Sequence, residues 1–269
     1  MIDWGSRTWL MGVINVTPDS FSDGGRFERP EAAVRQAQRM LAAGVDVLDL
    51  GGQSTRPGAI ELDAEQEWQR LAPVLGAIRS TFPAATLSVD TFHPLVAERA
   101  LAAGAHWINN VRGAHDGAML PLVAASGCPY VLMHSRGTSG SMDQLATYGD
   151  VVIDVRDALR AASERALAMG VKPGQLIWDP GLGFAKTTAH NLALLRGLEL
   201  LVAEGYPLLV GASRKRFLGD LLQQPKPQAR IWGTAAVGVQ AIAKGARILR
   251  VHDGAPMVQT ARMADALWR

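Results

Sequence analysis

The sequence predicts an α/β fold, a single (β/α)8 barrel of the TIM type over residues 1–269, and three observations support this. Eight short apolar runs alternate with segments rich in Ala, Leu, Arg and Glu. Each run ends in a residue that can hydrogen-bond, coordinate a metal or titrate. The length of 269 residues, 48% of them hydrophobic, suits one such barrel. Because barrel enzymes carry their sites at the C-terminal strand ends, these run ends are the candidate site.

The eight apolar runs are the predicted strands. In chain order they are LMGVIN (10–15), VDVLD (45–49), TLSVD (86–90), HWIN (106–109), YVLMHS (130–135), LIWD (176–179), PLLVGA (207–212) and ARILRVH (246–252). Alternate residues of a strand share a face, so Ser88 points with Asp90 and Arg250 with His252. If these faces line the barrel mouth, carboxylates, amides and cations from different strands converge there.

The segments between the runs are predicted helices at 31–43, 63–82, 94–103, 116–126, 151–169, 189–204, 228–244 and 256–268. Several end at a glycine, as at Gly44 and Gly127, where a left-handed cap costs least. No linker separates two domains. Four segments that follow strands are rich in glycine and polar residues: 17–27, 51–62, 136–149 and 181–188. We expect these to be functional loops, and the first two to become ordered only on ligand binding.

Composition excludes several classes of function. Twenty-seven Lys and Arg against 25 Asp and Glu leave a net charge of +2, which argues against a nucleic-acid partner. The one cysteine, Cys128, excludes an intramolecular disulfide and a CxxC metal site, and we expect it to be buried. No signal peptide and no apolar run near about 18 residues is present. We therefore expect a cytoplasmic protein with small-molecule substrates and no membrane partner.

Two loop motifs carry the chemical signal. The first reads NVTPDSFSDGG (15–25) and the second DLGGQSTRPGA (49–59). Glycines, hydroxyl donors and a guanidinium together suit a mobile lid that contacts an anion. An ordinary glycine-rich surface loop would account for either motif alone.

Six further motifs follow in order: SVDTF (88–92), INNVRG (108–113), LMHSRG (132–137), WDPGLGFAK (178–186), GASRKRFLG (211–219) and RVHD (250–253). Together the eight motifs resemble the dihydropteroate synthase family, and the resemblance covers residues 12–263. It implies that a dihydropterin carrying a 6-hydroxymethyl diphosphate condenses with p-aminobenzoate, giving 7,8-dihydropteroate and pyrophosphate in folate biosynthesis. It also implies a homodimer through helices late in the barrel.

The resemblance assigns substrate contacts residue by residue. The pterin would be held by Asp90, Asn109, Asp179 and Lys215, with Met133 and Phe184 as apolar walls. An ionised Asp179 only accepts hydrogen bonds and could take two from the amino-pyrimidinone edge. Arg250 and His252 match the family's anion-binding pair, Thr55 and Arg56 its contacts to phosphate or p-aminobenzoate, and Ser213 its p-aminobenzoate side. We expect Lys215, Arg250, His252 and Asp90 to act in catalysis.

A divalent cation, Mg²⁺, is the implied cofactor, and Asn15 matches the family's contact to it. A hard cation with mostly water and phosphate ligands needs few protein oxygens, so one amide suffices. The chemistry expected is departure of diphosphate before the weakly nucleophilic aniline attacks, without a covalent enzyme intermediate.

Two positions and three alternatives stay open. Asp49 is a weak site candidate at the mouth, and His134 is unassigned because its strand parity opposes that of Met133. The alternatives are a pterin-dependent methyltransferase, a binding-only paralogue and a barrel aldolase with Lys215 as Schiff-base amine. The first and third leave the two loop motifs unexplained, and the intact anion-binding residues argue against the second.

Overall fold

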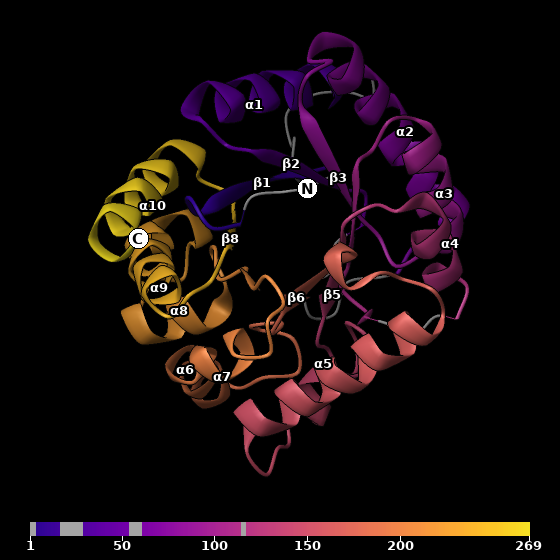
Figure 1. Ribbon diagram of the computed structural model, residues 1–269. Helices are drawn as coiled ribbons and strands as arrows, with labels where there is room; N and C mark the ends of the chain where they lie inside the picture. The colour runs from indigo at the N-terminus through magenta and orange to yellow at the C-terminus, as the bar shows by residue number, and fades with distance from the viewer. Residues whose placement is uncertain (1–3, 17–28, 54–60, 114–116) are drawn as a thin grey trace.

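The computed structural model describes residues 4–16, 29–53, 61–113 and 117–269, and the described residues form a barrel of parallel strands inside a ring of helices (Figure 1). The predicted fold class is confirmed. The strands are β1 (Trp9–Asn15), β2 (Val47–Gly51), β3 (Thr86–Asp90), β4 (Trp107–Asn110), β5 (Tyr130–Met133), β6 (Leu176–Asp179), β7 (Leu209–Val210) and β8 (Ile248–Val251). Each coincides with a predicted run or lies within two residues of it.

The strand order is β6-β5-β4-β3-β2-β1-β8-β7, so all sequential strands are neighbours except at the closure between β6 and β7. The register aligns the strand ends, because Asn15 lies opposite Gly51 and Asp90 lies opposite both Gly51 and Asn109. At the closure, the Trp178 amide donates to the Pro207 carbonyl at 2.9 Å, and Trp178 and Leu208 form an isolated bridge. The barrel is therefore closed beside Asp179 by these contacts and not by a strand ladder.

Ten helices follow the strands within the described residues. They are α1 (Arg29–Ala43), α2 (Ala64–Thr81), α3 (Pro94–Ala102), α4 (Met119–Ser126), α5 (Val151–Ala168), α6 (Thr188–Arg196), α7 (Leu198–Val202), α8 (Arg216–Leu222), α9 (Ile231–Ala243) and α10 (Gly254–Trp268). Short 3-10 turns lie at Met142–Leu145, Pro173–Gln175 and Pro227–Arg230. Gly127 ends α4 with φ 69°, the left-handed cap that the sequence predicts.

Three helix predictions need correction. The predicted helix 189–204 is two helices, α6 and α7, that meet at Gly197. A Cβ at Gly197 would lie 2.9 Å from the Val152 methyl groups, so close packing on α5 leaves room only for glycine. The predicted helix 228–244 begins as the 3-10 turn Pro227–Arg230 before α9. Helix α8 was not predicted, because its short sequence was interpreted only as a polar motif.

The barrel interior is apolar at its N-terminal end. A buried layer is formed by Met11, Val47, Trp107, Val131, Ile177, Leu209 and Ile248. Trp4 and Trp9 pack against it, with ring centroids 5.6 Å apart. A larger core fills the space between strands and helices, and it includes Trp178, whose indole N–H donates to Ser163 Oγ at 2.8 Å. The lower barrel is therefore filled, and polar side chains are left for the upper end.

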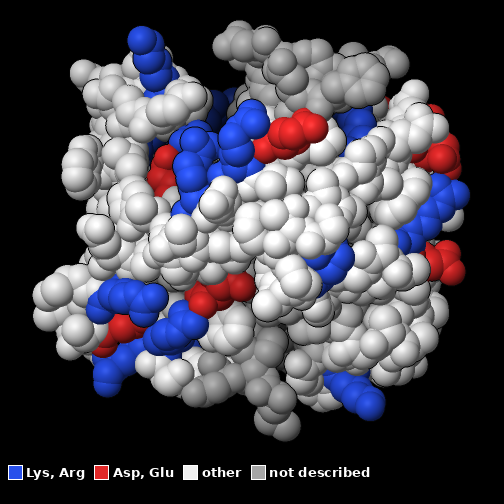
Figure 2. All heavy atoms as spheres, turned by 90° about the horizontal axis from the view of Figure 1, so that it is seen from above, with Lys and Arg blue, Asp and Glu red and all other residues white. Residues whose placement is uncertain are grey.

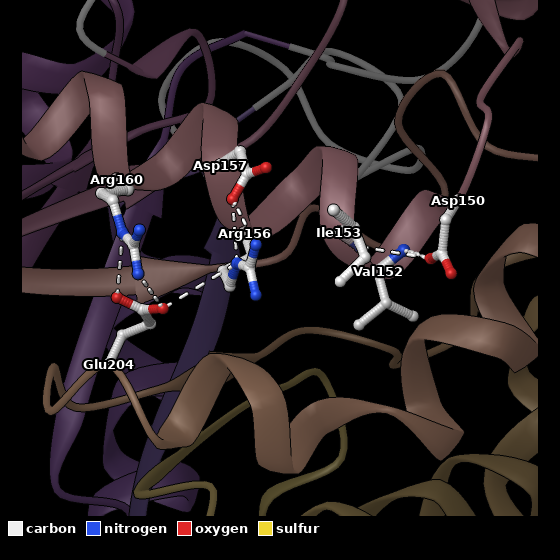
Figure 3. A network of polar contacts seen from close by, with 7 residues as sticks. All are labelled: Asp150, Val152, Ile153, Arg156, Asp157, Arg160 and Glu204. Carbon is white, nitrogen blue, oxygen red and sulfur yellow. Dashed lines mark hydrogen bonds and ion pairs between the residues drawn. The ribbon is translucent and has the colours of Figure 1, made fainter.

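Helix α5 is fixed at its start and along its outer face (Figure 3). The Asp150 carboxylate accepts from the backbone N–H groups of Val152 and Ile153 at 2.9 and 3.2 Å, a standard N-cap. Further along, Arg160 pairs with Glu204 at 2.7 Å, which ties α5 to the chain just after α7. Because Arg160 is exposed, this ion pair orients the two segments more than it stabilises them.

Charge on the outer surface is mixed. On the face drawn in Figure 2, Lys and Arg lie among Asp and Glu, and uncharged residues cover most of the area. Within the described residues, no helix is both long and apolar enough to span a bilayer.

Candidate functional site

Strand alternation brings polar side chains together inside the upper end of the barrel. Above the apolar layer, one residue of β2, β3, β4, β6 and β8 points inward. We call the following residues the mouth cluster: Asp49, Asp90, Asn109, Asp179, Lys215 and Arg250. The sequence predicted all of them for the site, Asp49 only as a weak candidate, and the structure brings them together.

Arg250 is the centre of the mouth cluster. Its Nε donates to Asp49 Oδ2 and its Nη2 to Asp90 Oδ2, each at 2.7 Å. Burial alone would lower the pKa of Arg250, but the carboxylates of Asp49 and Asp90 outweigh this and raise it. Burial raises the pKa of Asp90, and Arg250 opposes that rise. The guanidinium is thus a fixed cation at the base of the mouth.

Asp49 also orients Asn109. The same oxygen that binds Arg250 accepts from Asn109 Nδ2 at 3.0 Å, which sets the direction of the amide. The second oxygen, Asp49 Oδ1, and the neighbouring Ser88 Oγ are buried without a hydrogen-bond partner among the described residues. The weak candidate from the sequence is therefore a fully buried anchor for two site residues.

Asp179 and Lys215 face each other across the closure between β6 and β7. Asp179 Oδ1 accepts from the Gly181 amide at 2.7 Å. Burial raises the pKa of Asp179, and Lys215 is the main group that opposes this. Burial lowers the pKa of Lys215 to about 8, against the pull of Asp179. Lys215 Nζ also donates to the Leu182 carbonyl, so the lysine links the loops that follow β7 and β6.

An apolar wall borders these charges. Phe92, Val111 and Met133 form a buried cluster, with Phe184 packed against it and partly exposed. Lys215 Nζ lies 4.7 Å from the centroid of the Phe184 ring. Met133 and Phe184 are thus adjacent, as predicted, and an aromatic face beside hydrogen-bonding groups suits a flat heterocycle.

Ser213 and His252 form a pair on the β7–β8 side. Ser213 Oγ lies 3.1 Å from both the backbone N and the Nδ1 of His252. Asn15 is half-buried at the end of β1. Thr55 and Arg56 fall outside the described residues, as do most of the two loops expected to order on binding.

Sequence reasoning missed a buried carboxyl beside Asp90. Glu67 on α2 is 1% exposed, and the Thr91 hydroxyl donates to its Oε2 at 2.9 Å. Burial raises the pKa of Glu67 to about 7, with a further contribution from Asp90 and opposition from Thr91. Four of the five residues at 65–69 in α2 are Glu or Gln, and nothing in this pattern singles out Glu67.

A buried lysine was missed as well. Lys186 Nζ lies 2.9 Å from Nδ1 of His134, the residue left unassigned, which is itself buried. The only signal in the sequence is that Lys186 ends the motif WDPGLGFAK (178–186).

Two clefts open on the face formed by the C-terminal strand ends. The larger, about 720 Å³, is lined by Arg112, Ser135, Arg136, Gly137, Thr138, Gln144, Leu145 and Thr147. The smaller, about 340 Å³, is lined by Gln36, Arg39, Met40, Arg214, His252, Gly254 and Ala255. The larger cleft adjoins the ends of β4 and β5, and the smaller one adjoins the ends of β7 and β8.

Known proteins match this chain over its whole length. The family described as pterin binding enzyme matches residues 11–252. A dihydropteroate synthase of Synechocystis is 46% identical over 270 residues, covering 100% of this chain and 93% of that protein. The dihydropteroate synthase of Mycobacterium leprae is also 46% identical, with 96% and 92% covered.

Solved structures agree. A dihydropteroate synthase of Clostridium difficile, crystallised in the presence of pteroic acid, has a TM-score of 0.94, 38% identity and full coverage of both chains. A Xanthomonas albilineans dihydropteroate synthase with 4-aminobenzoic acid has a TM-score of 0.91 and 42% identity, covering 97% of this chain and 93% of the other.

Proposed function

This chain belongs to the pterin-binding enzyme family as a dihydropteroate synthase, and on that premise we propose that the mouth cluster binds the pterin and the β7–β8 side binds the diphosphate. The enzyme is a transferase that joins the pterin diphosphate to p-aminobenzoate in folate synthesis. The observation that supports the binding proposal is the convergence of Asp90, Asn109 and Asp179 from three strand ends with Lys215, which directly precedes α8. The relatives named above are dihydropteroate synthases, which favours this function over the three alternatives from the sequence, a pterin-dependent methyltransferase, a binding-only paralogue and a barrel aldolase.

The pterin edge would be read by one carboxylate and its neighbours. Asp179 Oδ1 accepts one hydrogen bond from the Gly181 amide, which leaves its second lone pair and Oδ2 for the ligand. The ionised carboxylate would accept from the ring N–H and the exocyclic amino group. Asn109, held by Asp49, and Lys215, held by Leu182, would complete the edge, with the ring against Phe184 and Met133.

The diphosphate would be bound by cations that the fold already holds in place. Arg250 uses two of its five N–H donors on Asp49 and Asp90, so its geometry is fixed before the anion arrives. The Ser213 hydroxyl at His252 fixes the imidazole on the same side. Preorganised donors stabilise developing negative charge without reorganisation in the transition state.

We propose Mg²⁺ as the cofactor, contacted by Asn15. The donor set fits: the amide oxygen of Asn15 is a hard ligand at the open end of β1, and the described residues contain no group of three or more His, Cys, Asp or Glu placed to hold a metal. Water and phosphate would therefore supply the other ligands. When bound, the ion would neutralise charge on the leaving diphosphate.

The chemistry proposed is ionisation before attack. The bond between the pterin methylene carbon and the diphosphate oxygen breaks, and its electron pair leaves with the diphosphate held by Arg250 and His252. The pterin ring delocalises the positive charge on the methylene. The aniline nitrogen of p-aminobenzoate then forms the new C–N bond and loses a proton to water. Mouth-cluster residues contribute positioning and charge, so no side chain needs to act as a nucleophile.

The p-aminobenzoate is proposed to contact Thr55, Arg56 and Ser213. Ser213 is described, and it is buried beside His252. If Arg56 captures this substrate, Arg56→Ala should raise the KM for p-aminobenzoate far more than it weakens binding of a pterin that lacks diphosphate. Equal losses for both ligands would contradict the assignment.

One experiment tests the function and the order of bond breaking. Purified protein with Mg²⁺ and the pterin diphosphate should form dihydropteroate when p-aminobenzoate is added. In single-turnover mixtures without p-aminobenzoate, the protein should still form pyrophosphate by C–O cleavage. That pyrophosphate can be bound or released. Product only with both substrates, and no C–O cleavage without the nucleophile, would support the reaction but favour direct displacement. No dihydropteroate under any condition would refute the function.

The partners proposed are the two substrates and a second copy of this chain. Exposed apolar side chains on α8 and α9, including Trp232, which is 79% exposed, support a homodimer through that surface. The cytoplasmic location expected from the sequence remains a prediction, which fractionation of cells expressing the protein would check.

A further inference from the structure

A lysine is buried directly behind the pterin-binding carboxylate. Lys186 is 4% exposed, and its Nζ makes three polar contacts. It donates to the Gly181 and Phe184 carbonyls at 3.0 Å each, and it lies 2.9 Å from His134 Nδ1. An ammonium has three N–H donors, so the two carbonyls and His134 Nδ1 satisfy it completely when that ring nitrogen carries no proton.

The three acceptors all belong to residues that shape the pterin site. Gly181 supplies the amide that binds Asp179 Oδ1 at 2.7 Å. Phe184 contributes the partly exposed ring of the apolar wall. The His134 amide donates to the Asp179 carbonyl at 2.9 Å, which joins the end of β5 to the end of β6. Lys186 therefore connects the groups on both sides of Asp179.

The backbone after β6 needs such a connection. Gly181, Gly183 and Ala185 have φ values of 65°, 75° and 49°, all in the left-handed region. For Ala185 this conformation is costly, and side chains hold it in place. Besides the two carbonyls bound by Lys186, the Ala185 carbonyl accepts from the Tyr148 hydroxyl at 2.9 Å and the Leu182 carbonyl accepts from Lys215.

The charge of Lys186 acts on Asp179 as well. Burial lowers the pKa of Lys186 well below its usual range; Asp179 opposes this, while Lys215 and Arg136 add to it. Three cations, Lys215, Arg250 and Lys186, each lower the pKa of Asp179 against the effect of burial. Asp179 also faces the carboxylate of Asp90. His134 and the Tyr148 ring complete the surroundings of the lysine.

We propose that Lys186 is a positioning residue for the synthase reaction: it holds the β6–α6 loop in the conformation that presents Asp179 and Phe184 to the pterin. Lys186 itself touches no substrate. The inference rests on the proposed role of Asp179 and Phe184 in pterin binding. It adds a residue that acts through backbone carbonyls.

The test compares Lys186→Met and Lys186→Arg with the matched control Lys172→Met. Lys172 is exposed and precedes the N-terminal end of β6, whereas Lys186 follows its C-terminal end. Binding of a pterin without diphosphate is measured by calorimetry from pH 5 to 9, with thermal melts to confirm folding. For Lys186→Met we expect affinity to fall tenfold or more, on the scale of a misplaced binding group. Its loss of affinity toward acid pH should also begin about one pH unit higher, because Asp179 loses a cationic neighbour.

The control Lys172→Met should match the native protein in both measurements. Lys186→Arg keeps the charge but cannot direct three N–H groups to the same three acceptors, so its affinity should fall while its acid limb stays near the native position. If Lys186→Met does not fold, Lys186→Arg decides, and native affinity in that variant overturns the proposal. A folded Lys186→Met with native affinity and an unshifted acid limb also overturns it.

The two proposals fail in different ways. A native protein that binds no pterin at any pH contradicts the proposed function itself. A native protein that binds pterin and forms dihydropteroate, with Lys186→Met indistinguishable from it, contradicts only the role of Lys186.

Discussion

Asp49 shows how one side chain can organise a site through residues on other strands. Its Oδ2 holds Arg250 from β8 and Asn109 from β4, and it is fully buried. The sequence indicated that Asp49 ends a strand, because VDVLD is an apolar run with a terminal carboxylate. Its partners could not be predicted, since they depend on the rotamers of two residues 60 and 201 positions away.

Asp179→Asn is expected to weaken pterin binding strongly. The amide would place N–H donors opposite N–H donors of the pterin edge, and a charged bidentate contact is worth about 3 kcal/mol or more, which corresponds to roughly a hundredfold. Calorimetry with a pterin lacking diphosphate would measure the loss. Near-native affinity in a folded Asp179→Asn protein would rule out Asp179 as the edge-binding group.

Glu67→Gln should change stability in a pH-dependent way. Burial raises the pKa of Glu67 from 4.5 to about 7 in the folded state, so the folded protein holds a proton that the unfolded chain releases above about pH 4.5. The stability from this group is present at low pH and is lost as pH rises through about 7. A neutral Gln avoids that loss, which is about 3 kcal/mol for a carboxyl group whose pKa rises from 4.5 to about 7.

Urea unfolding at pH 5 and pH 8.5 would measure this effect. Glu67→Gln should lie close to the native protein at pH 5, where most of the loss has not yet occurred, and should exceed its free energy of unfolding clearly at pH 8.5. Glu65→Gln, an exposed neighbour on α2, is the control and should change little at either pH. A constant difference between Glu67→Gln and native protein at both pH values would argue against a raised pKa.

At the scale of elements, the strands were predictable and some connections were not. Apolar runs with polar ends identify strands because parallel strands buried on both faces read as continuous apolar segments. The break at Gly197 depends on the methyl groups of Val152 on another helix, which no local pattern reveals. The same holds for the loop after β6, whose shape depends on Lys186 and Lys215 binding its carbonyls. The glycines predicted a loop there, but no local pattern indicates which side chains bind its carbonyls.

Gly181→Ala is predicted to disturb this loop and the site together. A Cβ at Gly181 would lie 1.9 Å from the His134 carbonyl oxygen, in addition to the strain of φ 65°. We expect a loss of about 2 kcal/mol or more in the free energy of unfolding, and weaker pterin binding.

Gly205→Ala separates the two causes of that loss. Gly205 has φ 86° but open space around its Cβ position, so this variant should lose only about 1 kcal/mol and bind pterin normally. Urea unfolding and calorimetry on both variants would check this. Equal losses in the two proteins would show that backbone strain, and not the contact with His134, dominates.

At the scale of the whole molecule, an exposed apolar surface lies on α8 and α9. Trp232 on α9 is 79% exposed, and Leu221 and Leu222 on α8 are exposed as well. A Cβ at Gly233 would lie 2.6 Å from Leu222, so the two helices meet at these residues and form one surface. The proposed homodimer would cover it.

Trp232→Lys should therefore convert a dimer into monomers without unfolding the barrel. A lysine ammonium at the centre of an apolar interface loses its hydration, which destabilises the dimer. On the surface of the monomer the same ammonium stays hydrated and leaves the fold stable. Sedimentation velocity would measure the oligomeric state, and circular dichroism would confirm the fold. Leu95→Lys, an exposed leucine on α3, should leave the dimer intact. A native protein that sediments as a monomer, or a dimer unaffected by Trp232→Lys, would contradict the proposed surface.

The closure of the barrel between β6 and β7 has a consequence for how the molecule opens. One isolated bridge and the bond from Trp178 to Pro207 join these strands, while every other neighbouring pair shares a ladder. Partial unfolding of a barrel should begin at its weakest junction, so backbone amides beside this one should exchange with deuterium soonest among the strands. Asp179 and Lys215 lie on opposite sides of the junction, and a pterin bound to both would bridge it. Substrate would then slow exchange there, and would protect the barrel from local opening as well as occupy its site.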